Sequence, residues 1–119
     1  AQNEKHFSTH NLEVLKGPEF DQLWEEAQSK ILERGLTVTP ESNRMAYTLK
    51  HEETITADEI ITGPVQPGTV QLTPAGKVIV LMRDAQTTGG YARILQLKEQ
   101  SINHLAQKRP GDTIHFSLT

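Results

Sequence analysis

The residues with the clearest capacity for chemistry lie in one polar segment between two apolar runs. Residues 86–91 read QTTGGY and follow Arg83 and Asp84. Paired glycines such as Gly89 and Gly90 let free backbone amides approach a ligand closely, and successive free amides bind anions. Gln86, Thr87 and Thr88 add side-chain donors and acceptors. The segment is therefore either a long hairpin connection or a loop that holds a carboxylate or an amide.

Three other polar residues are candidates for the same kind of site, each with an ordinary alternative. Arg44, in "SNRMAY", suits a two-pronged contact with a carboxylate, or it is a surface arginine beside an acidic neighbour. Gln71, in "GPVQPGTVQL", stands where a strand begins, as a ligand-facing or a solvated residue. Asp84 either orients the polar loop or pairs with Arg83.

The sequence contains no complete catalytic motif. The five histidines are scattered and form no HxH or HExxH pattern, so no metal site is predicted. A GxSxG elbow, a phosphate-binding P-loop and a dinucleotide fingerprint are also absent from the sequence. No catalytic residue is assigned, and the polar loop ends are more typical of one part of a site.

Composition bounds the class of protein. The chain of 119 residues has a one-domain length, with 35% hydrophobic residues and a formal net charge of −3. Few aromatic residues and no basic stripe argue against nucleic-acid binding. The absence of cysteine excludes disulfides and fits a cytoplasmic location. No apolar run is long enough to span a membrane, so no membrane partner is expected.

Hydrophobic patterning predicts a mainly β domain over residues 11–119, after a polar linker or tail at residues 1–10. A long helix is expected over about 19–33, with Trp24 in the core, and a short helix is expected to begin at a Ser101 cap. Alternating apolar residues predict six to eight strands, among them 11–15, 78–82, 91–97 and 113–118. Short strands with frequent turn signals are typical of a closed or nearly closed barrel.

Three blocks of the chain, in this order, resemble a known family. They read "SNRMAYTL", "GPVQPGTVQLTPAGKVIVLMRDAQTTGGYARI" and "HLAQKRPGDTIHF". They are similar to the C-terminal half of the allophanate hydrolase subunit 2 family, also called KipA-like or the 5-oxoprolinase C subunit. The resemblance covers roughly residues 12–116. Ala92 stands where family members usually have proline, which leaves one more backbone N–H at the end of the polar loop.

The resemblance implies a cyclophilin-like β-barrel with one long and one short helix, forming the C-terminal part of a longer subunit. It also implies a ligand-facing role for nine residues: Arg44, Gln71, Asp84, Gln86, Thr87, Thr88, Gly89, Gly90 and Tyr91. The partners it implies are the N-terminal half of the same subunit, a KipI-like (allophanate hydrolase subunit 1) protein and a small amide or lactam substrate.

The activity implied by the resemblance is ATP-dependent hydrolysis of the amide C–N bond of 5-oxoproline. ATP is used by the complex and not bound by this fragment, which is expected to be inactive alone. Two alternatives remain open on the sequence alone. One is a carboxyltransferase-type domain of a biotin-dependent urea carboxylase, and biotin is involved only in that case. The other is a regulatory KipA-like module that binds a kinase-inhibitor partner.

Overall fold

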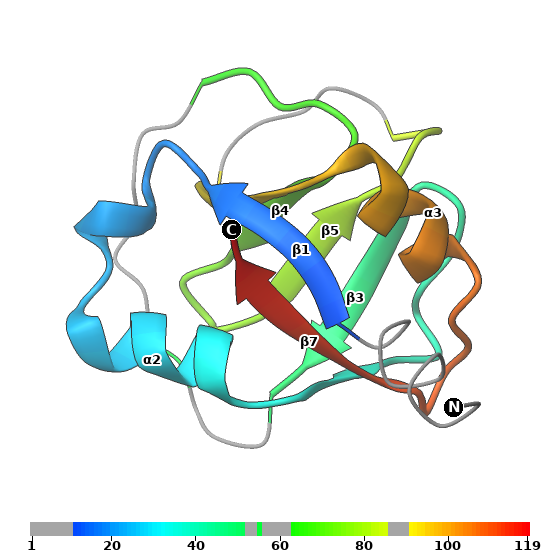
Figure 1. Cartoon of the computed structure of the whole chain (residues 1–119), viewed down its shortest axis with the longest axis horizontal. Coiled ribbons are helices and arrows are strands. Elements are labelled where there is room, and N and C mark those ends of the chain that lie inside the picture. The colour runs from blue at the N-terminus through cyan, green and yellow to red at the C-terminus, as the bar shows by residue number, and fades with distance from the viewer. Residues whose placement is uncertain (1–10, 52–54, 56–62, 86–90) are drawn as a thin grey trace.

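Seven strands of the described chain close into a barrel (Figure 1). The structure is a computed structural model that describes residues 11–51, 55, 63–85 and 91–119. The barrel order is β1-β6-β4-β5-β3-β2-β7, with every pair antiparallel except β1 and β7. The strands are β1 (Asn11–Lys16), β2 (Leu36–Val38), β3 (Ala46–Lys50), β4 (Thr69–Leu72), β5 (Val78–Leu81), β6 (Ala92–Leu97) and β7 (Thr113–Leu118). The barrel predicted from the sequence is confirmed.

The core fills the barrel because apolar side chains alternate along its strands. In β6 a bulge changes this period: Val70 pairs with Leu95, but the next residue, Gln71, pairs with Arg93. The extra residue lets Ile94 and Leu95 both be fully buried. Arg93, before the bulge, is left on the outer face of the barrel.

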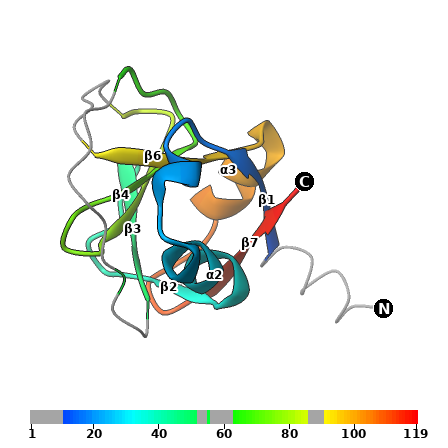
Figure 2. The ribbon, with the colours of Figure 1, turned by 90° about the vertical axis from the view of Figure 1, so that its left-hand side faces the viewer.

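Helical segments cover the two ends of the barrel (Figures 1 and 2). The helix predicted over 19–33 is in fact broken into a 3-10 helix, η1 (Phe20–Gln22), and α2 (Glu25–Glu33). Leu23 and Trp24 are extended between them, and the side-chain amide of Gln28 donates to the Phe20 and Leu23 carbonyls, which stabilises the break. The core position expected for Trp24 is wrong, because its side chain is 69% exposed.

The second helix, α3 (Glu99–Ala106), lies at the other end of the barrel. The sequence predicted that Ser101 caps this helix, and that prediction is wrong, because Lys98 holds the cap position. The buried Ser101 hydroxyl instead accepts a hydrogen bond from the Glu13 backbone N–H at 2.9 Å. Tyr47 joins β3 to the end of α3, with its hydroxyl 3.2 Å and 3.0 Å from two backbone carbonyls. No helix in the described ranges is both long and apolar enough to cross a bilayer.

The connection between β5 and β6 is not a hairpin. Both strands pair antiparallel with β4, one on each side, so they run parallel to each other. The Gly68 N–H donates to the Leu81 carbonyl at one end of β4, whereas Ala92 pairs with Leu72 at the other end. The hairpin interpretation of the polar segment is therefore wrong, because its two flanks lie at opposite ends of β4.

Candidate functional site

Arg44 and Asp84 line one pocket, at the α3 end of the barrel. The cavity measures about 380 Å³, and its wall is formed by Asn43, Arg44, Tyr47, Met82, Arg83, Asp84, Ile102 and Ala106. Both predicted site residues are exposed, and neither forms an ion pair with another described residue. Two opposite charges thus face one partly apolar cavity.

Local turns place these two charges. The Asn43 side-chain oxygen accepts bonds from the backbone N–H groups of Met45 and Ala46, at 2.8 Å and 3.2 Å, so Arg44 stands at the tip of a tight turn. Arg83 does not pair with Asp84. It contacts α3 instead, at 2.7 Å from Glu99, which leaves Asp84 to the pocket.

Gln71 lies on β4, outside this pocket. Its neighbours Val70 and Leu72 belong to the core, so Gln71 faces the outer side of the sheet. It is nevertheless only 3% exposed, and its side-chain nitrogen Nε2 has no hydrogen-bond partner among the described residues. A buried donor without an acceptor costs free energy, about 1–3 kcal/mol. This burial excludes the solvated strand residue offered as an alternative, and the ligand-facing role of Gln71 stays a prediction.

Tyr91 marks the far end of the candidate site. It is 43% exposed and precedes β6, next to the end of β4 that carries Leu72. The predicted residues Gln86, Thr87, Thr88, Gly89 and Gly90 lie outside the described residues.

The structure does not bring all predicted residues into one pocket. Arg44 and Asp84 lie together near the start of β4, Gln71 lies within β4, and Tyr91 lies beyond its end. Two strand spacings separate Arg44 from the β4 row, about 10 Å, and the pairing register adds about 13 Å along the strands to Gln71. Gln71 does not line the pocket that Arg44 and Asp84 share.

A buried ion pair beside Gln71 was missed by the sequence interpretation. Arg93 Nε and Nη2 donate to the two carboxylate oxygens of Glu19, each at 2.8 Å, and the Arg93 backbone N–H donates to Oε1 at 2.9 Å. The Arg93 hydrogen bonds hold the pKa of the Glu19 carboxyl below its usual value, although burial opposes them. Arg93 is the one charged residue inside the apolar run "ARILQL", and this position in the sequence could have indicated a buried ion pair.

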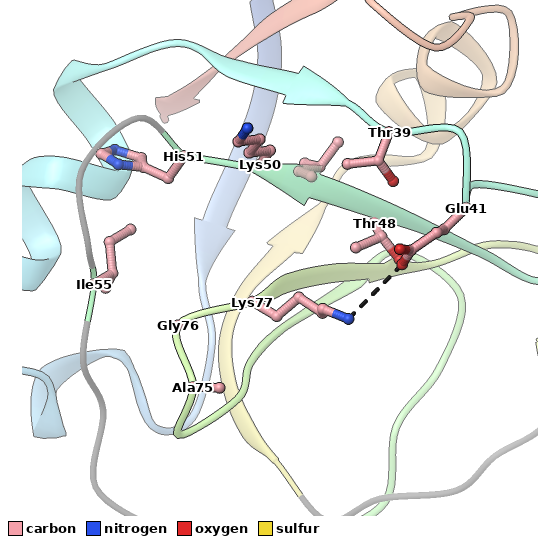
Figure 3. A pocket seen from close by; sticks show the side chains of 10 residues that line it. Thr39, Glu41, Thr48, Lys50, His51, Ile55, Ala75, Gly76 and Lys77 are labelled. Carbon is pink, nitrogen blue, oxygen red and sulfur yellow. Dashed lines mark ion pairs between the residues drawn. The ribbon is translucent and has the colours of Figure 1, made fainter.

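A second pocket, of about 400 Å³, lies on the outer side of β3 at the opposite end from α3 (Figure 3). Lys77 and Glu41 form an ion pair across it at 3.7 Å, and the buried Thr39 hydroxyl has no partner among the described residues. His51 Nε2 lies 2.6 Å from the Lys30 carbonyl, which attaches this edge to α2. Of the predicted residues that the structure describes, which are Arg44, Gln71, Asp84 and Tyr91, none lines this pocket.

Each of these two pockets carries charges of both signs. Asp84 lies beside Arg44 and Arg83 in one wall, and Glu41 lies beside Lys50 and Lys77 in the other. Gly76 and Lys77 lead into strand β5 and not into a helix, so they lack the P-loop arrangement. Within the described ranges, no group of three or more histidine and acidic side chains is placed to hold a metal ion.

The fold and these surfaces define a helix-capped β-barrel domain whose candidate groups lie on its rim and outer face. The family model for the carboxyltransferase domain, subdomain A and B, matches residues 1–118. Because this match covers nearly the whole sequence, the chain belongs to that family. The family resemblance seen in the sequence is thereby confirmed.

Two relatives agree with this membership. The 5-oxoprolinase C subunit of Escherichia coli K12 is 38% identical over 109 residues, which cover 90% of this chain and 35% of the relative. The 5-oxoprolinase C subunit of Haemophilus influenzae is 40% identical over 85 residues, 67% of this chain and 26% of the relative. The chain thus spans about a third or less of the length of these curated relatives.

A solved structure supports the fold alone. The crystal structure of Kluyveromyces lactis urea carboxylase matches 89% of this chain and 10% of its own, with a TM-score of 0.76 and 21% identity. The same barrel therefore occurs within a urea carboxylase.

Proposed function

We propose that this chain is the barrel part of the C subunit in a 5-oxoprolinase complex, which hydrolyses a lactam amide with the consumption of ATP. The observation that carries the proposal is the 38% identity to the Escherichia coli 5-oxoprolinase C subunit over 90% of the chain. The partners proposed are the remainder of the same subunit and a KipI-like subunit. The isolated chain is inactive in this proposal, because the remainder of the subunit and the partner subunits complete the site.

The proposed lactam-binding wall consists of Gln71, Tyr91 and residues 86–90. The Gln71 Nε2 donor is buried and has no partner among the described residues, so a lactam carbonyl would give it the acceptor that it lacks. Gln86, Thr88 and the backbone amides of Gly89 and Gly90 are proposed to donate to the carbonyl oxygen, on which negative charge develops as water adds to the amide carbon and before the C–N bond breaks. Thr87 completes the polar segment.

Arg44 and Asp84 are proposed to serve a separate part of the site. Gln71 does not line their pocket, and Arg44 has no described carboxylate partner. A carboxylate held by Arg44 in two-pronged geometry would fit this pocket. The carboxylate of a partner subunit's side chain is a candidate of that chemistry.

The test uses the full-length subunit, assembled with its partner subunits. Gln86→Ala and Thr88→Ala should each lower the ATP-dependent formation of glutamate from 5-oxoproline tenfold or more. Thr119→Ala, at the exposed end of β7, is the matched control and should turn over like the wild type. Wild-type rates from both site variants would show that this segment does not hold the substrate.

Carboxyl transfer is the second candidate, favoured by the name of the matching family. In that case the same donors would hold a carboxyl group, and activity would require biotin and not 5-oxoproline. A regulatory binding module is distinguished by stable capture of the KipI-like subunit without turnover of any lactam or urea. Assays of the assembled complex with each substrate separate the three functions.

A further inference from the structure

The ion pair between Glu19 and Arg93 joins three segments that are distant in the sequence. Glu19 belongs to the turn before η1, and its backbone N–H donates to the Arg93 carbonyl at 3.0 Å. Arg93 Nη1 donates to the Pro64 carbonyl at 2.9 Å, on the segment that leads to β4. The Arg93 side chain is thus held by the turn before η1 on one side and by residues 63–64 on the other.

The fit around the guanidinium is close. A Cβ atom added to Gly63 would lie 3.1 Å from Arg93 Nη1 and 3.4 Å from Nη2, which is tighter than ordinary contact. Glu19 is 4% exposed, and the ion pair is largely shielded from water. A planar guanidinium held by a bidentate carboxylate has one orientation, whereas an ammonium group has many.

This clamp lies beside Gln71 and Tyr91, the described residues of the proposed lactam-binding wall. Arg93 and Gln71 are paired across β6 and β4, so their side chains are neighbours on the outer face. The Arg93 guanidinium donates to Glu19 and Pro64, and a guanidinium accepts no hydrogen bond. It therefore gives Gln71 no acceptor, which explains why the Gln71 Nε2 donor finds no partner on this neighbour. Tyr91 lies only two residues before Arg93.

We infer that Arg93, clamped by Glu19, is a positioning residue that fixes the orientation of Gln71 and the start of β6 at Tyr91. This inference rests on the proposed function, since it assigns a role within the same wall. Arg93 itself does not touch the substrate. It limits where Gln71 can direct its donor. A displaced donor would weaken binding of the transition state more than binding of the substrate in its ground state.

Three variants of the full-length subunit test the inference. Glu19→Gln removes the charge, Arg93→Lys keeps the charge but loses the planar fork, and Gly63→Ala presses a methyl group against an intact ion pair. Asp21→Asn is the matched control, because it makes the same change to an acidic residue two positions away whose side chain is 81% exposed. Circular dichroism and capture of the partner subunits define the temperature range in which each variant is folded and assembled.

The first readout is the turnover of 5-oxoproline by folded complexes. We expect each of the three variants to lower kcat tenfold or more while KM changes less than threefold, and Asp21→Asn to match the wild type. If the ion pair only stabilises the fold, every variant should have the wild-type kcat wherever its complex is folded. In that case Arg93→Lys, which keeps the charge, should also retain most of the wild-type activity. Either of those results in a folded variant overturns the inference.

The second readout is independent of activity. In the full-length subunit labelled with ¹⁵N-glutamine, the side-chain amide resonances of Gln71, assigned with Gln71→Met, should shift in Glu19→Gln and Arg93→Lys but not in Asp21→Asn. Unshifted Gln71 resonances overturn the positioning role, even if the variants lose activity. A wild-type complex that does not turn over 5-oxoproline would instead contradict the proposed function, and the Gln71 resonances would still decide the positioning role.

Discussion

Replacing Glu19 by glutamine should destabilise the domain in proportion to the bonds that the structure assigns to its carboxylate. Oε1 accepts from the Arg93 backbone N–H and from Nε, and the amide oxygen of a glutamine can keep those two bonds. Oε2 accepts from Nη2 at 2.8 Å, and an NH₂ group at that place would set one donor against another. One charge-assisted bond is therefore lost, and the Arg93 charge is left without its counterion.

The expected loss in the free energy of unfolding is about 2–4 kcal/mol. A hydrogen bond to a charged group contributes about 1.5–3 kcal/mol. Removing one whole partner of a buried ion pair costs about 3–5 kcal/mol, which bounds the effect from above because the glutamine keeps part of the contact. At about 4 °C per kcal/mol for a domain of this size, Tm should fall by about 8–16 °C.

The same contact gives a defined dependence of stability on pH. The pKa of Glu19 is lowered in the folded state, first by the Arg93 side-chain hydrogen bonds. The charged carboxylate therefore stabilises the fold fully above its unfolded pKa of about 4.3, and this contribution is lost as pH falls through the lower folded pKa. The difference in stability between wild type and Glu19→Gln should be constant near pH 7 and shrink below about pH 4.3.

Urea unfolding followed by circular dichroism, from pH 7 down to pH 3, measures both effects. Asp21→Asn should change the free energy of unfolding by less than about 0.5 kcal/mol, because surface ion pairs contribute little. A cost for Glu19→Gln below about 1 kcal/mol at pH 7 would show that the ion pair does not stabilise the fold. A cost that grows as the solution is acidified would contradict the lowered pKa.

Three other changes test how the barrel is held together. Tyr47→Phe removes the hydroxyl that bonds the end of α3, and should cost about 1 kcal/mol in urea unfolding. Gly76→Ala and Gly111→Ala both force alanine to a positive φ, +88° and +97°, but only Gly76 also faces a backbone carbonyl, that of Ile55. Thermal unfolding should therefore show a clearly larger loss for Gly76→Ala, and equal losses would contradict the close approach. Trp24→Ser supplies a capping hydroxyl at the uncapped, exposed start of α2 and should stabilise the domain by about 1 kcal/mol, whereas a loss of stability would show that the contacts of the Trp24 side chain within the domain outweigh the cap.

Much of the fold could be predicted from local patterns. The strand "TIHFSL" buries Ile114 and Phe116, as the alternation indicates, and the apolar run at β5 forms a strand as expected. The helix break at Leu23 and Trp24 was not predictable from spacing, because the apolar residues keep a helical period through it. The side-chain amide of Gln28 stabilises the break, because it donates to carbonyls that a continuous helix would have used.

The order of the strands could not be derived in the same way. A polar segment between two apolar runs has the pattern of a hairpin, and only the pairing of β4 between β5 and β6 shows otherwise. The bulge after Arg93 has the same non-local origin, since it depends on the partner strand. Arg44 and Asp84 do line a ligand-sized pocket together, but the distance from that pocket to Gln71 follows from strand register.

The proposed lactam-binding wall depends most on Gln71, because we propose that its buried donor is kept for a ligand although it lowers stability. Gln71→Met removes that donor and fills the same volume with an apolar chain, so the folded domain should be as stable as the wild type or more so. The decisive measurement is the ATP-dependent hydrolysis of 5-oxoproline by the full-length complex that carries this variant. We expect a tenfold or greater loss of activity at unchanged or raised Tm, whereas full activity in the folded variant would show that Gln71 does not bind the substrate.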